Sequence, residues 1–580
     1  MATPPGQMLS AGPGAASSGP ALSGRPPVNP WLVVLALAPG VFLTLADATV
    51  MSVAVPLIIR RLEGSVISVS WVMNGYNLVL AVLFLTMGRL ADRYGHKLLF
   101  VLGLAVFAAA SVGCARAGSM EMLIAWRVVQ AVGAAAVVPT ALALLLQAFP
   151  DTRQGFAAGL FGALRSAAAA AGPVLGGLLI ERWGWPAVFW FNVPVGALGV
   201  VLALTLVRRR GLRTRTPLDW PGVGLVTAGL FCLTLAIIQG NDWGWTSGTI
   251  LGLFAAAAVI LAVWVWWELR TAVPLFDLRL FRRRTFAAAS AAIMTVDTAL
   301  MGTMFMLVIF MIAMLDYSEL KAGLAIAVVP AAVLVLTPFA GRLTDRIGPR
   351  VPAVAGALVA AAGLVALGYL HRSDPLGSVL WRSVLVGAGI GLSLPALLAA
   401  GMSVVPGGVK GAGSGMLNTA RQLGFLLGVA ILVAVFAHTM HTAVNGAADK
   451  GQALVRADSA LSDAVRAKLV TALEQARTIN ATAGIGELRR VAHPIAESIG
   501  QNVGFFEGLE LLKLKDTLEN LLWDEVSSAF RWPFFVAAIA AALGALAGAF
   551  LPRRLATAGA PAAADQPAAD PPLPRADVVP

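Results

Sequence analysis

The sequence predicts an all-α polytopic membrane protein in which fourteen transmembrane helices form two six-helix bundles plus two extra central helices. Three observations lead to this prediction. The composition is strongly apolar, the apolar residues gather in stretches long enough to cross a bilayer, and a motif of the first half recurs in the second. A soluble protein does not require this combination of features.

The composition excludes an ordinary soluble protein. Of the 580 residues, 58% are hydrophobic and only 12% are charged, whereas soluble domains carry about 25% charged residues. The net charge of +12 is assigned to Lys and Arg in cytoplasmic loops and not to nucleic-acid binding, because no basic block stands outside the loops. Cys114 and Cys232 lie in separate apolar runs, which indicates neither a metal site nor a disulfide framework.

A helix needs ~20 apolar residues to cross the bilayer core. Residues 1–30 are rich in Pro, Gly, Ala and Ser, and are predicted to form a disordered cytoplasmic tail rather than a signal peptide, as are residues 552–580. The expected spans between these tails are 31–56, 69–89, 98–116, 121–148, 156–180, 186–207, 220–239, 248–267, 285–314, 322–341, 351–370, 376–404, 413–438 and 531–551.

Positive charges predict the orientation of these spans. Alternate short loops are much richer in Lys and Arg than the loops opposite them, and cytoplasmic loops carry this excess. An even number of spans then places both termini in the cytoplasm. The residues of the rich set are Arg89, Arg93, Lys97, Arg153, Arg208, Arg209, Arg210, Arg213, Arg215, Arg270, Arg279, Arg282, Arg283, Arg284, Arg342, Arg346, Arg350 and Lys410.

The stretch 441–530 differs from the other loops. It is long, polar and mixed in charge, and it is expected to lie on the extracytoplasmic side, since long translocated segments do not follow the charge rule. Its leucine and valine spacing predicts two or three amphipathic helices. A small external hairpin or cap is therefore expected. Whether a periplasmic adaptor binds the protein is left open.

An internal repeat divides the chain. The loop Gly88–Lys97 recurs as Gly341–Arg350, 253 residues later (341 − 88). Arg165 recurs as Arg421, 256 residues later (421 − 165), with glycines at the same offset on both sides. We therefore expect two similar halves, 31–207 and 285–551, with residues 208–284 supplying the two extra helices. Parallel repeats are typical of transporters whose site lies between the halves.

The motifs at these positions resemble the major facilitator superfamily, and within it the fourteen-span drug:proton antiporters. The resemblance implies the major facilitator fold, a bacterial cytoplasmic (inner) membrane location, and multidrug efflux of hydrophobic compounds driven by a proton gradient without a cofactor. The motifs that carry it are Leu45–Pro56, Gly88–Lys97 with its copy Gly341–Arg350, Arg127–Gly133, the series Gly159, Gly172, Pro173, Gly176 and Gly177, and Trp185–Gly196.

The loop motif is the expected conformational gate. Its glycines permit a tight turn, and Asp92 can face a helix N-terminus or pair with an arginine. Such a bond would hold the cytoplasmic side shut in one conformation. The alternative is a plain turn whose charges only set topology, and the resemblance favours the gate. The residues assigned to it are Gly88, Asp92, Arg93, Gly95, Lys97, Asp345 and Arg346.

Asp47 is the first candidate for coupling to protons. It lies in the middle of the first span, where an ionised carboxylate must be neutralised, paired or hydrated. A carboxyl group that moves between such environments carries a proton, whereas a fixed hydrogen-bonded Asp would be structural. Arg127 stays protonated and could serve as its counter-ion, and the resemblance implies a part in proton coupling. The alternative for Arg127 is a snorkelling side chain near the membrane surface.

The second half offers further candidates. Asp297 lies in the span that repeats the first one, so it is a second candidate for proton or substrate coupling. Met301 and Met304 share that span and could contact an irregular apolar substrate, although a methionine-rich span is also plain core. Arg165 and Arg421 could line the cavity or gate its cytoplasmic mouth. Two carboxylates would suit cationic substrates, so a hydrophobic cation is the expected substrate, although the arginines could equally accept anions.

The antiporter motif of span 5 places small residues on one face. Small residues let helices approach closely, and Pro173 bends the chain. This predicts a tight seam between the halves, where ordinary helix packing is the alternative. The glycines of the motif are Gly159, Gly172, Gly176 and Gly177.

The sequence also argues against several other classes of protein. No P-loop sequence is present, which excludes a P-loop ATPase, and neither a catalytic nucleophile motif nor a metal-ligand spacing of histidines is found, so we expect no enzyme and no metal site. The partners expected are a hydrophobic small molecule, protons and the lipid bilayer. A dedicated exporter of an endogenous metabolite, lipid or antibiotic is the main alternative, and a non-transporting membrane scaffold or sensor is another.

Overall fold

The computed structural model describes residues 29–149, 154–207, 219–271, 274, 278–405, 410–458, 463–478, 514, 517–518, 520–521 and 523–554. Within these residues, 14 helices are long and apolar enough to cross a membrane, which confirms the expected number. The helices are α1 Pro30–Arg61, α2 Val66–Tyr94, α3 His96–Ala115, α4 Met120–Ala148, α5 Gln154–Trp183, α6 Pro186–Leu206, α7 Trp220–Trp243, α8 Gly248–Arg270, the short 3₁₀ helix η2 Leu278–Arg282, α9 Arg284–Ala313, α10 Glu319–Ile347, α11 Arg350–Leu367, α12 Leu376–Ser403, α13 Lys410–Ala457, α14 Asp463–Thr478 and α17 Arg531–Gly548.

The two halves repeat one packing scheme. In the first half α1 packs on α5 and α6, α3 on α4 and α6, and α2 on α4. In the second half α9 packs on α13 and α17, α11 on α12 and α17, and α10 on α12. The interfaces between the halves, α5 with α10 and α2 with α13, are also equivalent under the repeat. The sequence repeat therefore corresponds to a repeat in three dimensions.

The two extra helices lie beside this pair of bundles. α7 packs against α8 and also contacts α2 and α13, one helix from each half. α8 is the most exposed of the candidate spans, with 11% of its window buried. Its exposed residues include Leu251, Val259 and Trp266, as expected of a helix that faces lipid.

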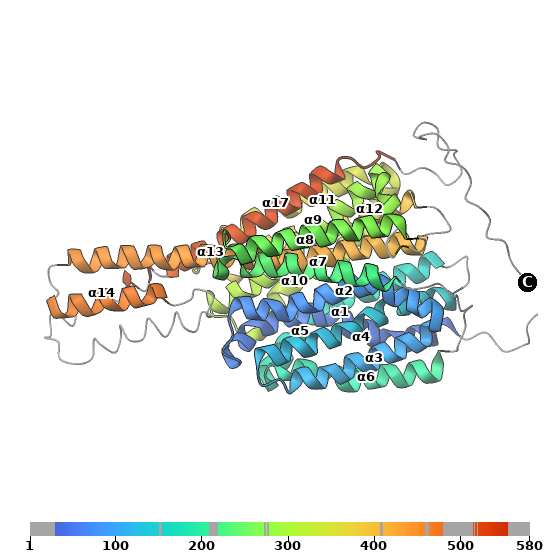
Figure 1. Ribbon diagram of the computed structural model, residues 1–580, viewed down its shortest axis with the longest axis horizontal. Coiled ribbons are helices and arrows are strands. Elements are labelled where there is room, and N and C mark those ends of the chain that lie inside the picture. Colours follow the sequence, from blue (N-terminus) through green and yellow to red (C-terminus); the bar gives the residue numbers. More distant parts are fainter. Residues whose placement is uncertain are drawn as a thin grey trace, which may run out of the picture.

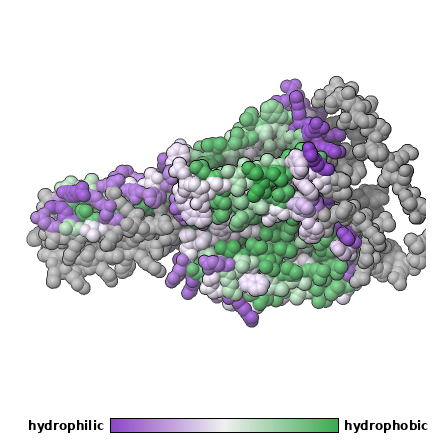
Figure 2. Space-filling view, in the orientation of Figure 1, coloured by the Kyte–Doolittle hydropathy of each residue, from purple (hydrophilic) through white to green (hydrophobic). Residues whose placement is uncertain are grey.

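The surface has an apolar belt between two polar ends (Figure 2). We call the end where α1 begins and α17 ends the basic face, since it carries Arg89, Arg93, Lys97, Arg279, Arg282, Arg283, Arg342, Arg346 and Arg350. We call the opposite end the extension face, because α13 and α14 project from it (Figure 1). An apolar belt between polar ends is the surface that a bilayer requires.

The thirteenth span is longer than expected. The sequence suggested 413–438, but α13 continues to Ala457 and carries the chain well beyond the belt. There α14 lies beside it around a small core of Val455, Leu469, Leu473, Leu514 and Leu518. Gln452 Nε2 donates to Glu474 Oε2 at 2.8 Å across the two helices. The described part of 441–530 thus contains the helix pairing that its apolar pattern predicted, while much of the rest lies outside the described residues.

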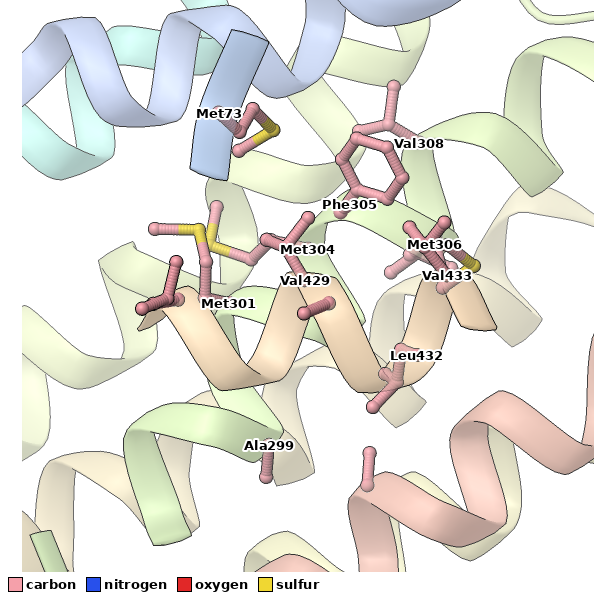
Figure 3. Packing of buried hydrophobic residues seen from close by; sticks show 14 of the residues in the cluster. Met73, Ala299, Met301, Met304, Phe305, Met306, Val308, Val429, Leu432 and Val433 are labelled. Atoms are coloured by element: carbon pink, nitrogen blue, oxygen red, sulfur yellow. The ribbon is translucent and has the colours of Figure 1, made fainter. Parts of the chain in front are cut away.

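The two halves close on each other at the extension face. One hydrophobic cluster joins Val50–Ile59 of α1 and Val66–Val82 of α2 to α9, α10 and α13 of the other half. Figure 3 shows part of this cluster, with Met73 of α2 and with Met301 and Met304 of α9. A second cluster lies toward the basic face and contains residues of the N-terminal half alone, among them Leu37, Phe100 and Phe161. The halves therefore share a core near the extension face and separate toward the basic face.

Candidate functional site

Asp47 and Arg127 form an ion pair inside the N-terminal half. Arg127 Nη1 of α4 donates to Asp47 Oδ2 of α1, and the two side chains are 0% (Asp47) and 1% (Arg127) exposed. Charges removed from water to this degree are stable only when they are paired and further hydrogen-bonded. Arg127 does not reach the membrane surface, so the snorkelling alternative is wrong for this residue.

A polar network surrounds the pair. Gln130 Oε1 accepts a 2.6 Å hydrogen bond from Arg127 Nη1, and Gln130 Nε2 donates to Ser111 Oγ at 2.8 Å. Asn192 Nδ2 of α6 donates to the same hydroxyl at 3.4 Å. The network thereby connects α1, α3, α4 and α6 through one buried charge pair. A change of charge at Asp47 therefore alters the hydrogen bonds that join these four helices.

Arg127 is also enclosed by aromatic rings. Its guanidinium lies 4.2 Å from the centroid of the Tyr76 ring and 6.0 Å from that of Phe189. Its Nε donates to the carbonyl of Val72 at 3.3 Å. A cation over an aromatic face is stabilised most when it is desolvated, as it is here. Arg127 therefore keeps several favourable contacts that do not depend on the charge of Asp47.

The second half holds a different pair. Arg421 Nε of α13 donates to Asp297 Oδ2 of α9 at 3.1 Å, with side-chain exposures of 13% and 0%. Asp297 Oδ1 is buried and has no hydrogen-bond partner among the described residues. The second half has no copy of the Asp47–Arg127 pair at the equivalent arginine. Arg382, which is equivalent to Arg127 in the repeat, instead binds Asp374 near the extension face at 2.9 Å. The two halves have thus kept the fold and diverged in where they place their charges.

A central cavity lies between the halves. Its empty volume is about 1100 Å³, the open solvent at its mouth included, and it is lined by both halves. Arg165, Arg421, Met301 and Met304 all line it, whereas Asp47, Asp297 and Arg127 do not. The remaining lining residues are Thr44, Leu45, Thr49, Tyr76, Asn77, Leu80, Phe84, Ala134, Val138, Ala169, Leu300, Pro330, Val333, Ile390, Leu394, Asn418, Gln422 and Phe425.

Tyr76 separates the cavity from the first ion pair. Its ring lines the cavity and also stacks on the Arg127 guanidinium. Its hydroxyl donates to the carbonyl of Thr44 at 3.4 Å. Thr44 and Thr49, which flank Asp47 along α1, line the cavity as well. Asp47 therefore lies behind one layer of side chains, close to the cavity but shielded from it.

The loop motif forms a tight turn in both copies. Gly95, between α2 and α3, has φ +105°, and its repeat Gly348 has φ +85°, a region that favours glycine. Gly88 lies within α2 with open space around it. Lys97 Nζ donates to the carbonyl of Leu204 at 2.8 Å, at the end of α6.

The charged gate residues are largely exposed. The Arg93 guanidinium lies 5.5 Å from the centroid of the exposed Tyr94 ring. Asp345 and Arg346 are exposed, and Asp345 forms no ion pair with any residue that the structure describes. The side chain of Asp92 lies outside the described residues. The bond expected of Asp92 thus stays a prediction, and among the described residues no ion pair of Asp345 holds the basic face shut.

The span-5 motif serves two interfaces. A Cβ at Gly172 would meet the carbonyl of Ala46, and one at Gly176 would meet Val50, so both glycines let α5 approach α1 of its own half. A Cβ at Gly177 would lie 2.7 Å from Leu320 Cα, and Gly323 of α10 abuts the carbonyl of Pro173. Gly159 lies within α5, nearer its start. Among the motif glycines whose surroundings the structure describes, Gly177 lies at the seam between the halves, whereas Gly172 and Gly176 lie against α1.

Several site residues were not identified from the sequence. Gln130 was visible only as part of a motif, and Ser111 and Asn192 reach it from other helices. Asn418 accepts a 3.3 Å hydrogen bond from Arg165 Nη1 across the two halves. One signal could have pointed to Asn418: it precedes Arg421 by three residues and so shares its helix face.

Known proteins share both the sequence pattern and the fold. The family model of the Major Facilitator Superfamily matches residues 37–429. The multidrug resistance protein Stp of Mycobacterium tuberculosis is 36% identical over 70% of this chain and 76% of its own. The tetracenomycin C resistance and export protein of Streptomyces glaucescens is 33% identical over 70% and 75%. The crystal structure of a bacterial homologue of the human lysosomal transporter Spinster, inward-facing and unoccupied, matches with a TM-score of 0.60 and 18% identity over 91% of this chain and 98% of that one.

Proposed function

This chain belongs to the Major Facilitator Superfamily, and we propose that it is an efflux transporter that exports hydrophobic small molecules in exchange for protons. The observation that carries the exchange is the buried pair of Asp47 and Arg127. Efflux itself follows the relatives, whose names describe multidrug resistance and the export of tetracenomycin C. One relative is named for the export of a single antibiotic, tetracenomycin C, so a dedicated exporter is the second candidate.

The pair suits a proton carrier because its two states differ in charge. When Asp47 takes up a proton, its carboxyl group loses the attraction to Arg127, while Arg127 keeps its contacts with Gln130, Val72 and Tyr76. A buried guanidinium without a counter-charge is destabilised by several kcal/mol. Protonation therefore favours a conformation in which Arg127 finds other partners or water. A proton bound at Asp47 thus shifts the equilibrium between conformations of the N-terminal half.

Alternating access would use the contacts between the two halves. In this conformation the halves share a core at the extension face, where Arg60 Nη2 and Glu319 Oε1 lie 3.5 Å apart. The cavity lies between the halves on the side where their cores separate. A substrate would enter from the basic face and leave after the seam of α5 and α10 opens. Arg421, which lines the cavity, and Asp297, which is buried behind it, are the second candidates for coupling.

The charge distribution supports an orientation for this cycle. The basic face carries most of the Lys and Arg of the short loops, and such loops remain in the cytoplasm. We therefore place the basic face, and with it both termini, in the cytoplasm of a bacterial cell, with the protein in its cytoplasmic membrane. This conformation is then open toward the cytoplasm, and export proceeds from the basic face to the extension face.

The experiment that tests this function uses purified full-length protein in proteoliposomes with an imposed pH gradient. Two fluorescent probes of opposite charge, ethidium and pyrenebutyrate, are followed across the membrane. We expect movement of at least one probe that depends on the gradient and stops when an ionophore dissipates it. Movement that is unaffected by the ionophore would contradict proton exchange. Equal leakage with and without protein for both probes would contradict efflux of this class of compound.

A further inference from the structure

The charged residues of the central cavity are both arginines. Arg165 comes from α5 of the N-terminal half and Arg421 from α13 of the C-terminal half. No carboxylate appears among the lining residues that the structure describes, because Asp47 and Asp297 are buried behind the wall. A cationic ligand in this cavity would therefore meet two positive charges and no exposed negative one.

The arginines are only partly neutralised. Arg165 Nη1 donates to the neutral amide of Asn418 at 3.3 Å, and Arg421 pairs with Asp297 through Nε alone. Neither guanidinium makes another hydrogen bond or ion pair with any described residue. Two guanidinium charges against one carboxylate leave a net charge of +1 at the cavity wall. Since a guanidinium presents a planar fork of donors, the unused N–H groups suit a carboxylate, sulfonate or phosphate.

The two positions are equivalent in the repeat, since 421 − 165 gives the offset of 256 found for the neighbouring glycines. Both guanidinium groups line the same cavity, and Arg165 reaches Asn418, which lies three residues before Arg421 on α13. Two like charges on opposite halves oppose closure of the space between them, because the repulsion grows as the halves approach. An anion bound between them removes that repulsion and joins the halves.

The rest of the lining is mainly apolar. Phe84 comes from the N-terminal half, and Met301, Met304 and Phe425 come from the C-terminal half. Aromatic and thioether side chains accommodate irregular hydrophobic bodies. The cavity thus combines an apolar surface with a positive centre, which is the complement of a hydrophobic molecule that carries one acidic group.

We propose that the central cavity binds an amphipathic organic anion, with its acidic group held between Arg165 and Arg421 and its body against the apolar lining. This inference names the substrate class of the proposed efflux function and rests on that function. The sequence favoured cationic substrates on the assumption that Asp47 and Asp297 both face the substrate. The cavity lining instead favours anionic substrates.

The test is equilibrium binding to full-length protein in nanodiscs, without any pH gradient. The probes are pyrenebutyrate, its uncharged analogue pyrenebutanol, and ethidium, all at one near-neutral pH. We expect pyrenebutyrate to bind about tenfold or more tightly than pyrenebutanol and ethidium to bind more weakly than either. R165Q and R421Q should each weaken pyrenebutyrate binding about tenfold and leave pyrenebutanol unchanged.

Two further variants keep the test decisive. D297N removes the carboxylate that offsets Arg421 and should tighten pyrenebutyrate binding, which a merely structural residue would not do. R466Q, the same substitution in α14 outside the bundle, should change nothing. If R421Q fails to fold, R165Q and D297N decide the matter.

Binding of ethidium or pyrenebutanol as tightly as pyrenebutyrate, or a preference that survives R165Q, would overturn the proposal. Because the assay has no gradient, a failure of anion binding is distinguishable from a failure of proton exchange, which only the proteoliposome assay measures.

Discussion

The guanidinium of Arg127 and the carboxylate of Asp47 meet inside the N-terminal half, where the two side chains are 1% and 0% exposed to solvent. Gln130 binds the same guanidinium nitrogen at 2.6 Å, and Ser111 holds Gln130 at 2.8 Å. The pair is therefore the centre of a network that joins four helices, and not an isolated contact. Its removal has consequences for both stability and transport.

The first prediction concerns the stability of this pair. Asp47→Asn and Arg127→Gln each leave one buried charge without its counter-charge, which is expected to cost about 3–5 kcal/mol of folding free energy. The double variant removes both charges and should be less destabilised than the sum of the single variants. Thermal unfolding in detergent, monitored by circular dichroism, measures all members of the cycle. Additive losses would mean that the two side chains do not interact.

The second prediction concerns the seam at the extension face. Gly177→Val would place a side chain against Leu320 of α10. Overpacking of this kind costs about 1–3 kcal/mol, which shifts an equilibrium between two conformations by about 5- to 150-fold. The extension face should open. The readout is bismaleimide crosslinking between Arg60→Cys and Glu319→Cys, whose native side chains lie 3.5 Å apart, with Cys114 and Cys232 replaced by serine.

Crosslinking should be markedly slower in Gly177→Val than in the parent protein. Gly252→Val is the matched control, since a Cβ at Gly252 of α8 meets nothing within 4 Å. Equal rates in all three proteins would show that α5 and α10 do not hold this face closed.

The third prediction concerns Asp374, which lies between α11 and α12 and pairs with Arg382 of α12. Burial disfavours the ionised form of Asp374, but hydrogen bonds from Arg382 and from the His371 backbone outweigh it and lower the pKa of this carboxyl group below its ordinary value of 3.8. A lowered pKa in the folded state adds stability above pH ~4 that is lost as the pH falls through the folded-state pKa.

Asp374→Asn should therefore lower the unfolding temperature at neutral pH. The difference from the unsubstituted protein should disappear as the pH is lowered through and below the folded-state pKa of Asp374. Thermal unfolding at a series of pH values measures this difference. A difference that is constant with pH would show that packing, and not the charge of Asp374, matters at this position. Gradient-driven transport should be unaffected, because Asp374 lies at the extension face, away from the cavity.

Much of the fold could be predicted from the sequence because it rests on local composition and on the repeat. Fourteen apolar stretches specify fourteen spans, and the equivalent glycines Gly95 and Gly348 both have a positive φ. The predicted end of α13 was wrong by almost twenty residues, since polar residues beyond the membrane continue a helix when another helix covers its apolar side. Leu469 and Leu473 of α14 provide that cover.

The charged residues of the candidate site were predictable from the sequence, but its neutral members and its arrangement were not. Mid-span Asp and Arg residues are conspicuous in an apolar sequence, so Asp47, Asp297 and the arginines were identified. Which side chains face the cavity depends on the rotation of each helix about its axis. Arg421 turns toward the cavity while Asp297 lies behind it, and no periodicity in spans this apolar reveals the difference. The asymmetry between the Arg127 and Arg382 pairs is likewise a tertiary property.

The most direct test of proton exchange compares two kinds of transport in Asp47→Asn. In proteoliposomes, gradient-driven accumulation of a transported probe requires coupling to protons, whereas exchange of labelled for unlabelled probe at equal pH requires only alternating access. If Asp47 carries the proton, Asp47→Asn will lose gradient-driven accumulation and retain exchange. If Asp47→Asn accumulates the probe under the gradient as well as wild type does, Asp47 is not the proton carrier and its pair with Arg127 does not couple transport to protons.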